Sequence, residues 1–288
     1  MMEERHGGPI VGQHSGLTVI DCEACGFYHL DPLPSDDEMA AMYESGQYYT
    51  QEKPAYISTS VRDREWWRVS YDRFLNIVQH RDGQTLLDIG CGPGMLLEAA
   101  RARGWRCTGI DPSPVAAEHA RLLGLDVVCC SFADFAPGKQ FDVVTATGVL
   151  EHVRDPGAVI AMMNEVLEPD GQIMVAVPRD FSPLQLATGL PPWWIHHTHI
   201  SYFSRASLEG LLKRHGFMVV EETTDYPMEW FVVCGKNHVG NPDVGAECHR
   251  RRMEFDLALG EGARAFYSGL AKIDIGRGII VAARRDGE

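Results

Sequence analysis

The stretch that decides the fold is LLDIGCGPG at residues 86–94, followed by GIDPS at residues 109–113. Its first four positions are apolar except for Asp88, which predicts a strand buried on both faces. The glycines after this strand let the backbone pass close to a ligand where any β-carbon would clash. Asp111 ends the next predicted strand, where its two oxygens suit the two hydroxyls of a ribose. The pattern therefore predicts a cofactor that contains a nucleoside.

The spacing of the glycines separates two classes of cofactor. A dinucleotide fingerprint, G-x-G-x-x-G, would place its third glycine at position 95, where this chain has Met95. The carboxylate of Asp88 would also repel a pyrophosphate, whereas it suits a cationic ligand. The glycine turn therefore favours a cofactor that carries a positive charge.

Together, D-x-G-C-G-x-G and the following strand that ends in aspartate resemble the class I S-adenosylmethionine (SAM)-dependent methyltransferases. Later segments agree with the same family, in the same order: FDVV at 141–144 resembles its fourth strand, VLEHV at 149–153 the segment after it, and LEPDGQ at 167–172 the turn into its fifth strand. The resemblance covers roughly residues 84 to 224. It implies an α/β fold with a Rossmann-like seven-stranded sheet, helices on both faces, and SAM as the cofactor.

Composition excludes several other classes of protein. A chain of 288 residues suits one main α/β domain with appended pieces. The formal charge of −14 argues against a nucleic-acid partner, because the only basic cluster is at residues 250–252. No apolar run approaches the ~20 residues that span a bilayer, so we expect no membrane partner and a cytoplasmic protein.

The chain divides into three predicted regions: a Cys/His ribbon-like arm at 1–35, an aromatic helical lid or linker at 36–80, and a methyltransferase domain at 81–288. Alternating patterns in the last region predict a parallel sheet with helices on both faces. The predicted strands are 84–89, 106–110, 125–129, 141–146, 171–177, 217–223 and 275–283. The predicted helices are 94–103, 114–123, 156–167 and 205–215, preceded by one at 61–80 and followed by one at 246–259.

Two segments interrupt this alternation, 178–204 and 225–274. Ligands of open α/β sheets bind beyond the carboxyl ends of the strands, and both segments leave such ends. We therefore expect these insertions to form a cap over the acceptor site.

The resemblance also implies which residues bind the cofactor. Asp111 is assigned to the ribose, with a helix N-terminal acid as the alternative. Ser131 and Phe132 are assigned to the adenine by register, with Asp134 as the alternative. The full predicted set is Asp88, Gly90, Cys91, Gly92, Gly94, Asp111, Pro112, Ser131, Phe132, Thr147 and Gly148.

The segment WWIHHTHISYF at 193–203 carries the predicted acceptor chemistry. A hydroxyl acceptor loses a proton during methyl transfer, and histidine takes protons near neutral pH. The pattern HIxYFS, from His199, resembles one found in methyltransferases of sugars and other small metabolites, which makes His199 the candidate base. His197 and His152 are further catalytic candidates, and His152 has a structural role as its alternative. For His199 the alternative is a histidine bonded to a loop carbonyl. A metal site formed by His196, His197 and His199 is a further alternative. The predicted acceptor-binding residues are Asp180, Gln185, Trp194, His196 and Tyr202.

The arm contains C-x-x-C-G at residues 22–26, which resembles half of a zinc ribbon. The usual upstream cysteine pair is absent, so histidines would complete a tetrahedral site. The predicted ligands of a structural zinc are Cys22, Cys25, His6 and His14, with His29 also available. A metal-free knuckle held by packing is the alternative.

The sequence therefore predicts an enzyme that transfers a methyl group from SAM to a small-molecule acceptor, with a hydroxyl of a sugar or related bacterial metabolite as the first hypothesis. C- or N-methylation of a nucleotide-linked deoxy or amino sugar is an alternative within the same family. Two other classes remain as hypotheses: a nicotinamide-dependent oxidoreductase on a similar sheet, and a zinc-dependent binding protein with a degenerate cofactor pocket.

Overall fold

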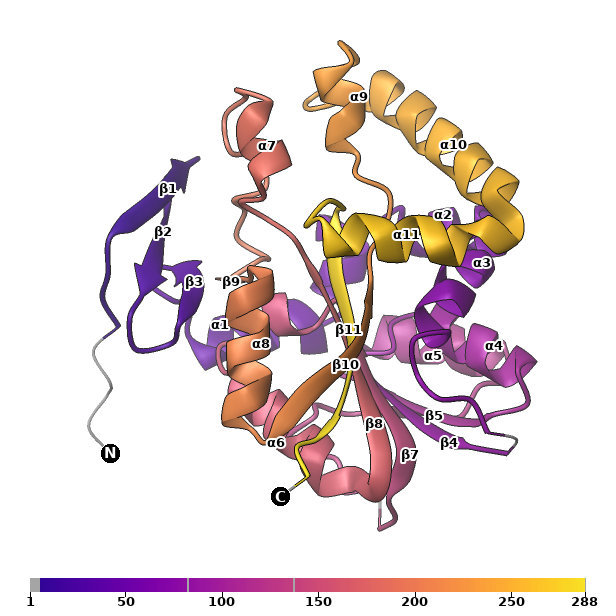
Figure 1. The fold of residues 1–288 in the computed structure, drawn as a ribbon. Coiled ribbons are helices and arrows are strands. Elements are labelled where there is room, and N and C mark those ends of the chain that lie inside the picture. The colour runs from indigo at the N-terminus through magenta and orange to yellow at the C-terminus, as the bar shows by residue number, and fades with distance from the viewer. Residues whose placement is uncertain (1–5, 82, 137, 288) are drawn as a thin grey trace.

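The computed structural model describes residues 6–81, 83–136 and 138–287 and contains two sheets (Figure 1). Residues 1–5 of the predicted arm lie outside the described part. The large sheet has seven strands in the order β10-β11-β8-β7-β4-β5-β6, and the small sheet has four in the order β1-β2-β3-β9. The strands are β1 (Ile10–His14), β2 (Leu17–Cys22), β3 (Phe27–Leu30), β4 (Thr85–Ile89), β5 (Arg106–Asp111), β6 (Val127–Cys129), β7 (Phe141–Thr147), β8 (Leu167–Pro178), β9 (Ser201–Tyr202), β10 (Phe217–Thr223) and β11 (Gly278–Arg285).

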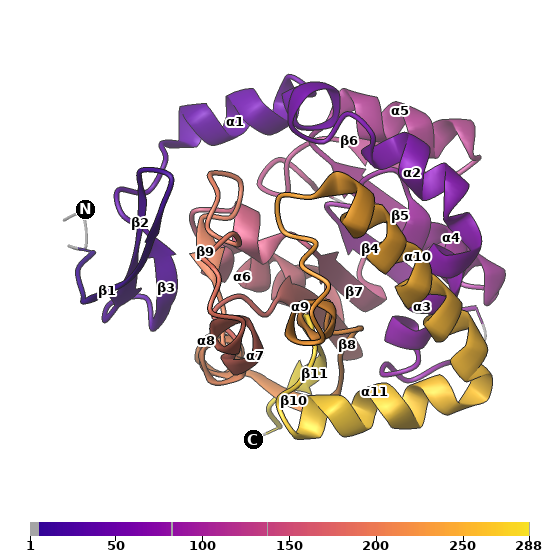
Figure 2. The ribbon, with the colours of Figure 1, turned by 90° about the horizontal axis from the view of Figure 1, so that it is seen from above.

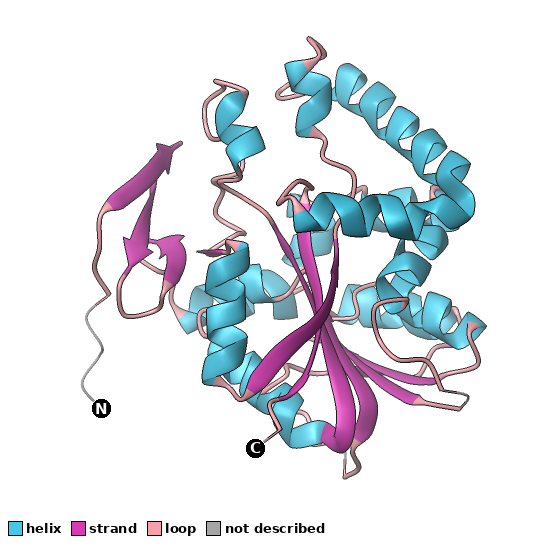
Figure 3. Cartoon of the chain, viewed as in Figure 1, coloured by secondary structure: helices cyan, strands magenta, loops and turns pink. Residues whose placement is uncertain are grey.

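The large sheet has the predicted architecture, with one difference in strand direction. Strands β4 to β8 run parallel, whereas β11 pairs antiparallel with both β8 and β10. Helices cover both faces (Figure 3). They are α1 (Asp36–Glu44), α2 (Tyr56–Arg62), α3 (Arg64–Leu75), α4 (Met95–Ala102), α5 (Pro114–Leu122), α6 (Pro156–Val166), α7 (Pro183–Ala187), α8 (Arg205–Arg214), α9 (Glu229–Val233), α10 (Pro242–Leu259) and α11 (Ala263–Lys272).

Two apolar cores fill the spaces between the sheet and its helices. One packs α6 and α8 on one face through residues such as Ile160 and Leu208, and the other packs α3 and α4 on the opposite face through residues such as Phe74 and Leu97. Strand β4 lies between these two cores and is buried from Leu86 to Ile89, which explains its successive apolar residues Leu86 and Leu87. The exception within β4 is Asp88, which is buried at its carboxyl end.

The single helix predicted at 61–80 is wrong in its boundaries, because the chain forms α2 and α3 with a break at Asp63. The buried carboxylate of Asp63 accepts hydrogen bonds from Arg62 and contacts His249 of α10 at 3.0 Å. The break therefore coincides with a tertiary contact that residues 61–80 alone do not reveal.

Within the late insertion, α10 packs on α3 and α11 packs on β10. Figure 2 shows α10 lying across α3. Asp256 of α10 is buried and accepts hydrogen bonds from Trp66 Nε1, at 2.6 Å, and from the Tyr267 hydroxyl. A buried carboxylate needs such partners, so these bonds fix α10 and α11 against α3. No helix within the described ranges is long and apolar enough to cross a membrane.

Candidate active site

The glycine turn after β4 has a backbone that excludes other residues. Gly90, Gly92 and Gly94 all have positive φ, at 66°, 53° and 92°. A β-carbon on Gly90 would lie 2.6 Å from Val149 Cγ2, and one on Gly94 would lie 2.4 Å from Leu125 Cδ1. The turn thus requires glycine both for its conformation and for the close approach of its neighbours.

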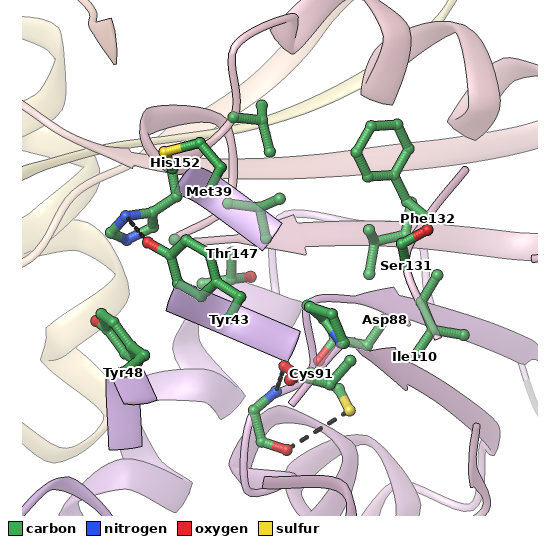
Figure 4. Close-up of a pocket in the computed structure, with 18 of the residues that line it drawn as sticks. Met39, Tyr43, Tyr48, Asp88, Cys91, Ile110, Ser131, Phe132, Thr147 and His152 are labelled. Carbon is green, nitrogen blue, oxygen red and sulfur yellow. Dashed lines mark hydrogen bonds between the residues drawn. The ribbon is translucent and has the colours of Figure 1, made fainter. Parts of the chain in front are cut away.

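A cavity of about 650 Å³ opens beside this turn (Figure 4). Its lining includes the ends of β4, β5 and β7 and, from the lid, side chains of α1 and of the π-helical turn η1 (Tyr48–Glu52). Gly94 is the one predicted cofactor residue that is not among those lining the cavity; it lies in the glycine turn and is the N-cap of α4. The remaining ten predicted residues line the cavity: Asp88, Gly90, Cys91, Gly92, Asp111, Pro112, Ser131, Phe132, Thr147 and Gly148.

The two ends of the cavity carry different side chains. In Figure 4, Ser131 and Phe132 lie at one end, while Tyr48 and His152 lie at the other. The alternative adenine residue, Asp134, has a supporting position, since its Oδ2 accepts a hydrogen bond from the Ser131 hydroxyl at 2.6 Å. The cavity therefore has room for an elongated ligand with one end against the residues predicted to bind adenine.

Asp111 is buried at the end of β5 and has both carboxylate oxygens engaged. Oδ2 accepts a hydrogen bond from the amide of Gly92, and Oδ1 accepts one from the amide of Ser113, each at 2.8 Å. Burial raises the pKa of Asp111 to about 6, although these two hydrogen bonds act to lower it. Each oxygen keeps a second lone pair, so the carboxylate can still accept bonds from both hydroxyls of a ribose.

The centre of the cavity carries buried polar groups that suit a charged ligand. Burial raises the pKa of Asp88 to about 7, against the effect of the Thr145 hydroxyl, which donates to its Oδ1 at 2.6 Å. Thr147 Oγ1 and Glu151 Oε2 are buried without a hydrogen-bond partner among the described residues. Such groups favour a ligand that supplies donors and positive charge, which fits the ammonium and sulfonium groups of SAM.

At the other end of the cavity, His199 is held by a chain of charged groups. Its Nδ1 lies 3.3 Å from Oδ2 of Asp180, which is buried. Oδ1 of Asp180 accepts hydrogen bonds from Arg277 at 2.8 Å and from Gln185 at 3.2 Å. Burial acts to raise the pKa of Asp180, but Arg277 and His199 hold it well below its usual range. Since an ionised carboxylate only accepts, Nδ1 of His199 carries the proton toward Asp180, and Nε2 is the free base.

His152 lies beside His199, with ring centroids 4.9 Å apart. Its Nδ1 is 2.5 Å from the carbonyl oxygen of Thr198 and 2.8 Å from the hydroxyl of Tyr43. A carbonyl only accepts, so Nδ1 carries the proton. Burial, together with the charge of His199, lowers the pKa of His152 well below its ordinary value. His152 is therefore a neutral imidazole at physiological pH.

Glu151 completes this group. One donor atom of each of Glu151, His152 and His199 lies within 4.8 Å of the others. Burial raises the pKa of Glu151 to about 7, although His199 acts to lower it. The group therefore has a carboxyl that changes charge near neutral pH next to two imidazoles.

Comparison with known proteins agrees with this geometry. A family model described as a methyltransferase domain matches residues 62–222. The chain belongs to this methyltransferase family. Its large sheet has the fold of SAM-dependent methyltransferases of known structure.

Two curated relatives of the methyltransferase share its central region. Over 154 residues it is 32% identical to the ubiquinone biosynthesis O-methyltransferase of Rhodopseudomonas palustris, covering 49% of this chain and 61% of that protein. Over 103 residues it is 40% identical to the protein of the same name from Pseudomonas paraeruginosa, covering 33% of this chain and 44% of that one. The matches thus span less than two thirds of these relatives.

Solved structures share the fold of the methyltransferase. The 1,6-didemethyltoxoflavin-N1-methyltransferase of Burkholderia thailandensis, solved with S-adenosylhomocysteine (SAH), superposes with a TM-score of 0.55 at 16% identity, covering 95% of this chain and 97% of that one. A SAM-dependent methyltransferase of Archaeoglobus fulgidus gives a TM-score of 0.55 at 18% identity, covering 80% and 99%.

Three residues of the predicted acceptor segment are not among those that line the cavity. His197 is half exposed, and its Nε2 lies 3.1 Å from Glu52 at the surface. Trp194 and Tyr202 are buried in the apolar cluster of the small sheet, where both contact Phe181. Both side chains point away from the cavity because this segment folds back onto the amino-terminal sheet.

The other predicted acceptor residues support His199 from outside the cavity. Asp180 and Gln185 are buried behind it, and His196 packs on its ring with centroids 4.0 Å apart while bonding Thr198 Oγ1 at 2.7 Å. Nothing in the sequence pointed to Arg277, because it lies 97 positions from Asp180. Tyr43 and Tyr48 had a signal, namely the density of aromatic residues between positions 43 and 71.

Proposed function

We propose that the methyltransferase transfers the methyl group of SAM to a hydroxyl of a small-molecule acceptor, with His199 as the general base. The main support for this proposal is the series of contacts from Arg277 through Asp180 to His199. His199 lines the same cavity as Asp111 and the glycine turn. One cavity therefore contains both a base, His199 Nε2, and the residues that suit a nucleoside.

Each residue has a defined task in this reaction. When bound, SAM supplies a methyl group activated by its positive sulfur. Asp111 binds the ribose, and Asp88 balances positive charge in the centre of the cavity. His199 Nε2 takes the proton of the acceptor hydroxyl, and Asp180 stabilises the imidazolium that forms. Arg277 keeps Asp180 ionised.

The lid favours an acceptor that contains a ring with hydroxyl groups. Met39, Tyr43 and Tyr48 lie along one side of the cavity (Figure 4). Tyrosine rings pack on the apolar face of a ring, and their hydroxyls bond its oxygens. Burial raises the pKa of Tyr48 to about 12, so it is a neutral donor. Sugars and related metabolites have this chemistry, and the two curated relatives are named O-methyltransferases.

Transfer of labelled methyl groups tests the proposal. The enzyme is incubated with methyl-labelled SAM and, in parallel, nucleotide-linked hexoses, free hexoses, catechols and primary amines, and the label is located by mass spectrometry and NMR. We expect the label on oxygen. Label found only on nitrogen or carbon would contradict the proposal.

The role of His199 has a matched control two positions away. We expect His199→Gln to lower kcat by about 10²- to 10⁴-fold, the range typical of a lost general base, with the affinity for SAH within twofold of the wild type. His197→Gln removes an exposed imidazole from the same segment and should leave kcat within twofold. Equal effects of the two substitutions would rule out His199 as the base.

A further inference from the structure

The amino-terminal sheet brings four metal-ligating side chains into one group outside the cavity. One donor atom of each of His6, Cys22, Cys25 and His29 lies within 4.8 Å of the others. His14, which the sequence indicated as the fourth ligand, lies instead at the hairpin turn, opposite Leu17. His29 takes its place because β3 runs antiparallel to β2.

The separations within the group are those of a tetrahedral zinc site. His6 Nδ1 lies 3.2 Å from His29 Nε2, 3.7 Å from Cys22 Sγ and 3.4 Å from Cys25 Sγ. With Zn–N near 2.0 Å and Zn–S near 2.3 Å, tetrahedral ligands lie about 3.3 Å apart for two nitrogens and about 3.5 Å for a nitrogen and a sulfur. The three separations from His6 are therefore close to those that the ion needs, and the other donor atoms lie within 4.8 Å of one another.

The backbone around the group holds each ligand in position. Nδ1 of His29 donates to the carbonyl oxygen of Leu30 at 2.7 Å, so Nε2 is the unprotonated nitrogen that faces His6. Residues 7–9 run beside β2 through hydrogen bonds from the amides of Asp21 and Glu23. A β-carbon on Gly8 would lie 1.7 Å from the carbonyl oxygen of Asp21, so only glycine allows this approach, which carries His6 over the two cysteines.

The group is joined directly to the acceptor end of the cavity. His29 of β3 pairs with Ser201 of β9, two residues beyond His199. The amide of Leu30 donates to the carbonyl of Ile200 at 2.9 Å, and the amide of Ile200 donates to the carbonyl of Glu151 at 2.8 Å. The strand that carries a metal ligand thus also holds the backbone next to His199.

We propose that His6, Cys22, Cys25 and His29 bind one zinc ion, and that this ion fixes the amino-terminal sheet against β9 and so positions His199. The second part rests on the function proposed above. A misplacement of about 1 Å at a catalytic group costs up to about 100-fold in rate. Loss of zinc should therefore lower kcat by ~10- to 100-fold and leave the binding of SAH intact.

Metal analysis tests the site independently of activity. Full-length protein without an affinity tag should contain about one zinc per chain, and cobalt(II) substitution should give the intense visible bands of a tetrahedral site with thiolate ligands. Cys22→Ser and His29→Ala should each lose the zinc, whereas His14→Ala, on the same hairpin, should keep it. Less than about 0.2 zinc per chain after refilling with zinc, a Cys22–Cys25 disulfide, or loss of zinc in His14→Ala would overturn the site.

Chelation of the wild-type protein tests the coupling without a variant that might misfold. We expect the zinc-free protein to bind SAH within twofold of the original affinity, to exchange backbone amides faster at residues 6–30 and 196–203, and to recover kcat when zinc is restored. Unchanged kcat after complete zinc removal would overturn the positioning role. Failure of the proposed function has a different signature, because zinc would then bind in the absence of any methyl transfer to oxygen.

Discussion

The two ends of the cavity are built in different ways. The end that we propose binds the cofactor, called the cofactor end below, is assembled from the carboxyl ends of β4, β5 and β7 and the loop after β6. The acceptor end combines the lid, the segment 179–200, residue Arg277 beside β11, and a small sheet from the amino terminus. The first end repeats one local unit, whereas the second depends on contacts between distant segments.

Residues at the two ends therefore depend on different kinds of contact. Asp111 acts through its place at the end of a strand, and its nearest partners, Gly92 and Ser113, belong to the same βα repeats. His199 depends on Asp180, which lies 19 residues before it in the chain. Asp180 in turn depends on Arg277, which lies 97 residues after it. Substitutions at the two ends should therefore separate cofactor binding from turnover.

The largest expected effect in this comparison is at the cofactor end. Asp111→Ala removes an acceptor of two ribose hydroxyls, and hydrogen bonds to a charged group contribute about 1.5–3 kcal/mol each. We expect the Kd for SAH, measured by calorimetry, to rise at least ~100-fold. Asp170→Ala, at an exposed position near the start of β8, is the control and should bind normally. Normal SAH binding by a folded Asp111→Ala protein would remove the distinction between the two ends.

An intermediate effect is expected at the acceptor end. Asp180→Asn keeps the size of the side chain but removes the charge that stabilises an imidazolium at His199. We expect kcat to fall by about 10- to 100-fold, with the Kd for SAH unchanged. Asp243→Asn, at the exposed start of α10, provides the control. A loss of SAH binding in Asp180→Asn would show that the ends are not separable.

The smallest expected effect is the dependence of cofactor binding on pH. Burial raises the pKa of Asp88 to about 7 and that of Asp111 to about 6, so both carboxyls gain protons as the pH falls from 8 to 6. A positively charged ligand binds the ionised form, so affinity for SAM should fall about tenfold over this range, and binding at pH 6.5 should release protons.

Calorimetry in buffers of different ionisation enthalpy measures these protons. Asp88→Asn removes the carboxyl with the higher pKa of these two, and its affinity for SAM should vary less between pH 6 and 8 than that of the wild type. An equally steep pH dependence in Asp88→Asn would assign the titration to another group, such as Glu151.

The sequence determined the cofactor end because its signals are local. Gly90 and Gly92 follow a buried strand and precede a helix within one short stretch, and sterics at such a turn leave little choice of residue. The arrangement of side chains at the acceptor end follows only from the tertiary structure. It turned Trp194 and Tyr202 inward, left His197 at the surface, and brought Arg277 to Asp180. Contacts between segments far apart in the chain depend on how complete layers pack, and residue spacing does not encode that packing.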